Sequence, residues 1–180
     1  MVMHKHDVST EQGKMPSNEF IQEMGGLIGE LLQKGVMKDG AGLGKSINRT
    51  RVSFKNGERT VVDGPFGGPT GAGNSNQLVT FFFQIKSKSR AEAVEWASKL
   101  GRALGGDVDI EVGKTTENWD LGFEPEPPNP PFNALLLVKA DARSEAGQPL
   151  SKSVVAAVDA LKREMTDAGV LTSAATLTPS

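Results

Sequence analysis

The sequence has 180 residues, with no cysteine, no tyrosine and only two histidines. The absence of cysteine excludes disulfides, thiolate nucleophiles and zinc sites with sulfur ligands, and it suits a reducing compartment. No hydrophobic run approaches the roughly 20 residues of a membrane span, and the N-terminus has no apolar stretch of signal-peptide length. We therefore expect a cytoplasmic protein without a membrane partner.

The sequence also has no large excess of positive or negative charge. The formal net charge is −2, and acidic and basic residues are interspersed. Nucleic-acid binding favours a basic stripe, so we expect no nucleic-acid partner. The glycine-rich stretch 64–73 leads into a predicted strand, whereas a phosphate-binding loop opens a helix. The segment 42–46 lacks the spacing of such a loop, and we expect no cofactor.

The chain does contain an internal repeat. Residues 1–46 align without a gap on residues 135–180, at a constant offset of 134, and 12 of the 46 pairs are identical. Ordinary composition would give roughly three. We therefore divide the chain into a complete unit, 1–123, a proline-rich linker, 124–131, and a partial second unit, 132–180.

Each copy of the repeat predicts a strand followed by a helix. Ser17 and Ser151 stand where helix N-caps belong, and apolar residues recur after them at helical spacing. Gly35 and Gly169 follow at the position of a left-handed C-terminal residue. In the second copy, 132–139 is an apolar run typical of a strand buried on both faces.

The rest of the first unit predicts a hairpin, two strands and a helix. Asn56-Gly57 lies between two β-prone runs, which is a strong hairpin signal. A strand over 78–85, a helix begun by Ser89 and a strand from Asp107 follow. This order predicts an α+β fold of the ferredoxin-like, split βαβ type.

Three consecutive phenylalanines, 81–83, place large apolar groups on both faces of the central strand. Helices cover one face of such a sheet, so the other face would expose an apolar patch unless a second sheet covered it. We therefore expect a homodimer built as a dimeric α/β barrel, with the segment 132–180 added to a sheet edge or exchanged between copies.

Several segments in order resemble the YCII-related family, and specifically its branch with the DGPF motif. The segments are Thr60–Phe66, Phe82–Ser89, Ala91–Ala97, Asp109–Gly113 and Trp119–Gly122, with Lys139–Gly147 and Ala168–Leu171 resembling the domain's opening. The resemblance implies a ferredoxin-like dimeric barrel with a cleft and a bacterial origin. It also implies genes near those of extracytoplasmic-function sigma factors, so that a sigma-factor partner rests on family analogy alone.

The chain departs from this branch after Phe66, where Gly-Gly-Pro-Thr-Gly replaces the usual acidic segment. Enzymes of the wider family are thought to use a His–Asp pair. His4 is close to a comparable strand, with His6 on the same face, and the two imidazoles suit acid–base chemistry or a shared metal ion. The second copy has Val138 and Ala140 at these positions, so the repeated unit itself does not require histidine.

Asp63 ends a predicted hairpin strand and precedes Gly64-Pro65. Its carboxylate suits a general base at the mouth of a cleft, or an acceptor of hydrogen bonds from the turn backbone. Phe66 is then a lid on a ligand or a plug in the core.

Arg49 and Arg51 alternate along a strand and so share one face. Such a pair can hold the carboxylate or phosphate of a ligand, or line a solvated face beside carboxylates. Lys5 and Lys139 occur in both copies, which favours a structural role such as snorkelling from the core.

Two functions follow from the residues and the resemblance. The first is the binding of a small anionic metabolite by Arg49, Arg51 and Phe66, with proton-transfer or elimination chemistry through His4 and Asp63. The second is a non-catalytic regulatory or protein-interaction module. Whether the protein is an enzyme stays open.

Overall fold

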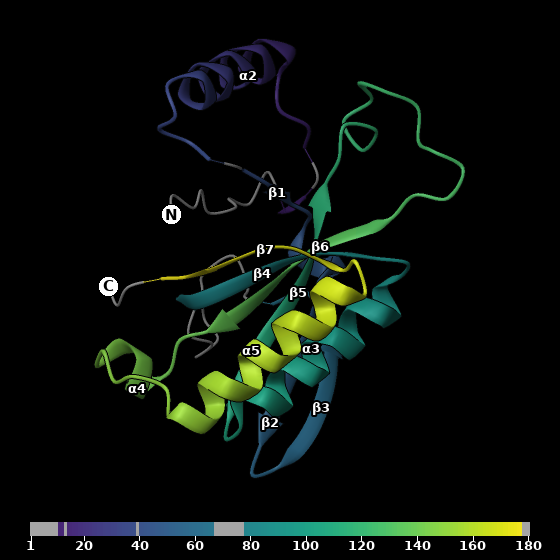
Figure 1. Cartoon of the computed structure of the whole chain (residues 1–180). Helices are drawn as coiled ribbons and strands as arrows, with labels where there is room; N and C mark the ends of the chain where they lie inside the picture. The colour runs from purple at the N-terminus through teal and green to yellow at the C-terminus, as the bar shows by residue number, and fades with distance from the viewer. Residues whose placement is uncertain (1–10, 13, 39, 67–77, 178–180) are drawn as a thin grey trace.

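The computed structural model describes residues 11–12, 14–38, 40–66 and 78–177 (Figure 1). Its helices are α2 (Asn18–Gln33), α3 (Arg90–Leu104), α4 (Ala142–Glu145) and α5 (Lys152–Asp167), with a 3-10 turn, η1 (Ser46–Asn48). Its strands are β1 (Gly42–Leu43), β2 (Thr50–Lys55), β3 (Glu58–Asp63), β4 (Val79–Ser87), β5 (Val108–Thr116), β6 (Phe132–Lys139) and β7 (Leu171–Thr176).

The strands form one seven-stranded antiparallel sheet. The order is β3-β2-β5-β6-β4-β7, and the short β1 pairs with β5. The structure is therefore α+β, as the sequence predicts. The strand β6 lies between β5 and β4, inside the sheet, so the expectation that residues 132–180 add to an edge is wrong for β6. Its apolar run explains this place, because an interior strand is covered on both faces.

Two strand–helix–strand units interleave in this sheet. The first is β4-α3-β5 and the second is β6-α5-β7; each skips one strand, and the other unit supplies that strand. The helices α3 and α5 lie side by side on the same face of the sheet (Figure 1). We call this the helix face and the opposite side the open face.

The hydrophobic core lies between the sheet and these two helices. Alternate side chains of each strand point into it, because successive residues of a strand face opposite sides. Its largest fully buried apolar side chains are Phe83, Ile85, Leu100, Ile110, Leu136 and Met165. The core thus joins strands and helices from both sides of the linker 124–131.

The hairpin predicted at Asn56-Gly57 is confirmed. Asn56 and Gly57 have positive φ angles of 51° and 83°, and β2 pairs with β3 from Thr50↔Asp63 to Lys55↔Glu58. Positive φ at both central residues matches the twist of the flanking strands. The hairpin extends the sheet beyond β5 and carries Arg51 and Asp63, two of the residues that the sequence singles out.

The triple phenylalanine does face both sides of β4. Phe81 and Phe83 are buried on the helix face, while Phe82 is half-buried on the open face opposite Leu137. Most of the large exposed apolar side chains lie elsewhere, and five of them are on α2. The surface that led us to expect sheet-on-sheet packing is therefore smaller than predicted.

The helices α2 and α5 repeat each other at the offset of 134. Ser17 and Ser151 cap them by accepting a hydrogen bond from the third residue along, and Gly35 and Gly169 follow with φ angles of 67° and 68°. Their surroundings differ. Three residues of α5 are buried, whereas α2 has none.

Within the two helices, one leucine position is identical, and it allows this difference in packing to be tested. Leu161 is 6% exposed and Leu27 is 47% exposed. We expect Leu161→Ala to lower the free energy of unfolding of the monomer by about 2–5 kcal/mol, because it leaves a cavity. Leu27→Ala should change it by about 0.5 kcal/mol or less. Urea unfolding at low protein concentration measures both, and equal losses would contradict the difference in packing.

Candidate functional site

A buried glutamate lies at the centre of the open face. Glu111 is 2% exposed although it stands in the middle of β5. Its neighbours along the strand, Ile110 and Val112, face the helices, so its carboxylate points to the other side. Arg51 is directly opposite it on β2, and Leu137 is opposite it on β6. A carboxylate in such a place must be paired, because an isolated buried charge is costly.

Three cations surround this carboxylate, and we call the four residues the Glu111 cluster. Arg51 lies 2.5 Å from Oε1 of Glu111, while Lys139 and Arg49 lie 3.2 Å and 3.8 Å from Oε2. Lys139 comes from β6, and both arginines come from the chain around the start of β2. The side chains of Lys139, Arg49 and Arg51 are 8%, 16% and 17% exposed.

A glycine and a phenylalanine shape the space around the arginines. Gly113 lies two residues after Glu111 on β5, and a Cβ there would lie 3.0 Å from Leu43 and 3.8 Å from the Arg49 side chain. Its missing side chain leaves room for both. The Arg51 guanidinium lies 4.3 Å from the centre of the Phe66 ring, a cation–π contact. Phe66 therefore covers the arginine rather than plugging the core.

The pKa values of Glu111 and Lys139 reflect their burial and the charges around them. Burial alone would raise the pKa of Glu111, but the Lys139 and Arg51 cations outweigh it and hold that pKa below its ordinary value. Burial lowers the pKa of Lys139, Glu111 opposes that effect, and the charges of Arg51 and Arg49 reinforce it. The cluster thus favours an ionised Glu111 and carries an excess of positive charge.

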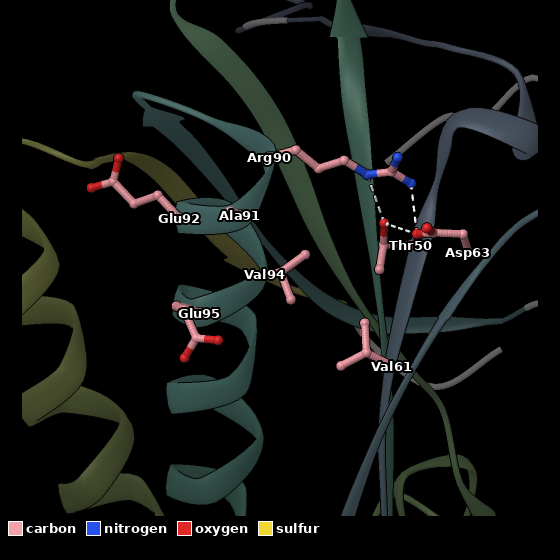
Figure 2. Close-up of a pocket in the computed structure, with 8 residues that line it drawn as sticks. All are labelled: Thr50, Val61, Asp63, Arg90, Ala91, Glu92, Val94 and Glu95. Atoms are coloured by element: carbon pink, nitrogen blue, oxygen red, sulfur yellow. Dashed lines mark hydrogen bonds and ion pairs between the residues drawn. The ribbon is translucent and has the colours of Figure 1, made fainter.

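A second polar cluster lies on the helix face of β2, and Figure 2 shows it. Asp63 accepts a hydrogen bond of 2.8 Å from the Thr50 hydroxyl and one of 2.8 Å from Arg90, which also donates to Thr50. Arg90 is the first residue of α3. This Asp63 cluster fastens the end of the hairpin to the helix. The Asp63 side chain is 67% exposed.

The turn after Asp63 packs tightly on η1. Gly64 donates its N–H to the carbonyl of Arg49, and its peptide bond to Pro65 is cis. A Cβ on Gly64 would lie 1.9 Å from the carbonyl oxygen of Ser46, so only glycine fits here. The turn carries the chain from the Asp63 cluster to Phe66, beside the Glu111 cluster.

The structure brings together some of the residues that the sequence singles out. Arg49, Arg51 and Phe66 meet on the open face. Thr50 and Arg90 hold Asp63 on the other face of the hairpin, away from the side chains of Arg49 and Arg51. His4 lies outside the described residues.

Sequence reasoning missed Glu111 and Arg90 and misread Lys139. Snorkelling would place the Lys139 ammonium in water, but it is buried against Glu111, so that interpretation is wrong. A charged residue between Ile110 and Val112, in a strand buried on both faces, is the signal that could have identified Glu111. Its partners Arg49, Arg51 and Lys139 are 62, 60 and 28 residues away in the sequence, and no local pattern joins them to it.

The described residues include no group of three or more histidine, aspartate or glutamate side chains that could hold a metal ion. Nor do they include a helix that is long and apolar enough to cross a membrane. No family model matches the chain, and neither a curated protein nor a solved structure matches it.

Removing the central carboxylate should destabilise the protein strongly. Glu111→Gln leaves three cations without their counter-charge, and we expect a loss of about 3–5 kcal/mol in the free energy of unfolding. Asp63→Asn is the matched control. Its ion pair with Arg90 is largely exposed, and the loss should stay below about 1 kcal/mol. Urea unfolding compares the two, and a similar cost for both would show that the Glu111 cluster is not a buried ionic centre.

Stability should fall in acid for the same reason. The folded state holds the pKa of Glu111 below its ordinary value of 4.5. Its carboxylate therefore contributes stability that is fully present above that pH and is lost as the pH falls through the lowered value. The melting temperature of the wild type should therefore fall as the pH is lowered below 4.5. The Glu111→Gln variant should lack the part of this fall that comes from protonation of Glu111. Melting curves between about pH 7 and pH 3 measure this difference. The same fall in melting temperature for the wild type and the variant would show that Glu111 does not contribute this acid dependence.

Proposed function

We propose that this protein binds a small dianion, such as a phosphate or a dicarboxylate, at the Glu111 cluster. The observation that carries the proposal is the charge of this cluster. Arg49, Arg51 and Lys139 contribute three positive charges and Glu111 one negative charge, which leaves an excess of two. A dianion would neutralise that excess in surroundings that exclude most water.

The donors of the arginines support the same ligand. The Arg51 Nε is buried and has no hydrogen-bond partner among the residues that the structure describes. Buried polar atoms are usually paired, so this N–H can donate a hydrogen bond to a ligand. Arg49 donates to the carbonyl of Gly44 through two of its nitrogens, which holds its guanidinium in place. Both arginines keep a small exposed fraction, through which a ligand can reach them.

Glu111 acts in this proposal as a positioning residue. Its two oxygens gather cations from β2 and β6, which would otherwise repel one another. The Phe66 ring covers the Arg51 guanidinium and limits its hydration. Acid–base chemistry by Asp63 is no part of the proposed site, because that carboxylate is bound to Arg90 on the opposite face of β2.

We also propose that the fold is ferredoxin-like and that the chain is related to the YCII family through its DGPF branch. The interleaved units β4-α3-β5 and β6-α5-β7, with the order β7-β4-β6-β5, support the first proposal. The second rests on the motifs in the sequence. The dimeric barrel would need a second sheet packed on the open face.

A second candidate function is that of a protein-interaction module without catalysis. The exposed apolar side of α2 favours it, because contiguous apolar patches on a protein surface commonly mark sites of association. This function requires no chemistry at the Glu111 cluster, whose charges would then serve the fold alone.

Anion binding can be tested by thermal shift and calorimetry. At constant ionic strength, phosphate or malonate at about 100 times its Kd should raise the melting temperature by about 5–10 °C relative to chloride. Arg51→Gln should lose most of this shift, because it removes a positive charge and the Nε donor. Arg59→Gln is the control, since Arg59 lies on the same hairpin but pairs with Glu95 and Ser98 of α3. A shift that Arg51→Gln leaves unchanged would sink the proposal.

A further inference from the structure

The helix α2 leaves an apolar stripe uncovered. Its members share helical spacing and are 37–51% exposed; they are Phe20, Met24, Leu27, Ile28 and Leu32. The helix stands apart from the layer formed by α3 and α5 and makes no extensive contact with another described helix or strand (Figure 1). Five large apolar side chains on one side of one helix are more than the scattered exposure that a monomer normally shows.

The repeat indicates what such a helix packs against. In α5, Leu161 and Met165 are buried beside α3, and Glu164 pairs with Lys99 of α3 at 2.6 Å. The residues at the same positions of α2 are Leu27, Leu31 and Glu30. The helix α2 therefore has side chains similar to those with which α5 packs against α3.

An acidic row borders the stripe of α2. Glu19, Glu23 and Glu30 recur at spacings of four and seven residues, so they line one side of the helix next to Phe20 and Leu27. Glu30 pairs with Lys34 one turn along, which leaves Glu19 and Glu23 as the excess negative charge of this side. A surface that fits this helix should accordingly be apolar in the middle and positively charged at its rim. The same row disfavours insertion into an anionic membrane surface.

The outer surface of the helix layer offers such a groove. It lies between α3 and α5 and has a volume of about 490 Å³. The lining residues are Lys99, Arg102, Ala103, Ala157, Ala160, Leu161 and Glu164. Three alanines leave room for large side chains of another helix. Lys99 and Arg102 supply two positive charges against the one negative charge of Glu164, which pairs with Lys99, so the rim is positive on balance.

A second shallow groove beside α3 fits less well. It lies between α3 and β3, where the lining includes three carboxylates, those of Asp63, Glu92 and Glu95, and one cation, that of Arg90 (Figure 2). The acidic row of α2 would be repelled there. Charge thus distinguishes two grooves of comparable size.

We propose that α2 of one copy docks in the groove between α3 and α5 of a second copy. Each copy carries both the helix and the groove, so two copies can exchange them reciprocally and close a two-fold dimer. A helix lying in a groove is a small contact by itself. A reciprocal exchange doubles the contact, and stable interfaces bury roughly 800 Å² per partner.

Two substitutions at exposed positions separate the helix from the groove. Leu27→Asp disables the stripe, and Ala160→Glu fills the groove and adds a negative charge. By sedimentation velocity in the micromolar range, we expect a dimer for the wild type and a monomer for each variant. Val155→Asp is the control, because Val155 is an exposed apolar residue of α5 outside the groove, and this variant should stay dimeric.

Mixing the two variants completes the test. Leu27→Asp keeps a functional groove and Ala160→Glu keeps a functional helix, so the mixture should form a heterodimer through one contact, at least ten-fold weaker than the wild-type dimer. A monomeric wild type, or a mixture that stays monomeric, would overturn the proposal. If the dimer persists in Ala160→Glu but not in Leu27→Asp, α2 pairs with α2 of the second copy. If it persists in both variants, the copies associate through their sheets. Either result would also overturn the proposal.

Discussion

A carboxylate buried inside a β-sheet has to be neutralised, and this requirement organises the open face. Glu111 stands on the interior strand β5, where water cannot solvate it. Its partners come from β2 and β6, on the two sides of its own strand. The same ionic contacts therefore join the hairpin, the central strand and the segment after the proline-rich linker. Their excess of positive charge is the basis on which we propose an anion site at the centre of the sheet.

The hairpin β2–β3 carries polar groups on both faces, and the two faces make different contacts. Arg51 points to Glu111, whereas its neighbour Thr50 points to Asp63 and Arg90. Alternation along a strand separates these groups although they are adjacent in sequence. The tight turn at Gly64 then brings Phe66 back to the arginine face. One short segment thus fastens α3 on one side and shapes the proposed ligand site on the other.

The repeat shows that one sequence pattern can serve two places in a structure. Leu27 and Leu161 occupy the same position of nearly identical helical frames, with matching caps. One is exposed on α2 and the other is buried on α5. Helix formation follows from the local pattern, but burial requires a partner surface. In this structure α3 and the sheet provide that surface for α5, and our proposal assigns the groove of a second copy to α2.

The sequence by itself determined the elements whose causes are local. Asn56-Gly57 predicted the hairpin, and Ser151 and Gly169 marked the ends of α5, because turn and cap residues act within a few positions. Only the tertiary structure decided which strand lies in the middle of the sheet and which charges meet. Glu111 pairs with residues 60 and 28 positions away, and contacts at such separations depend on how the whole chain packs rather than on any local preference.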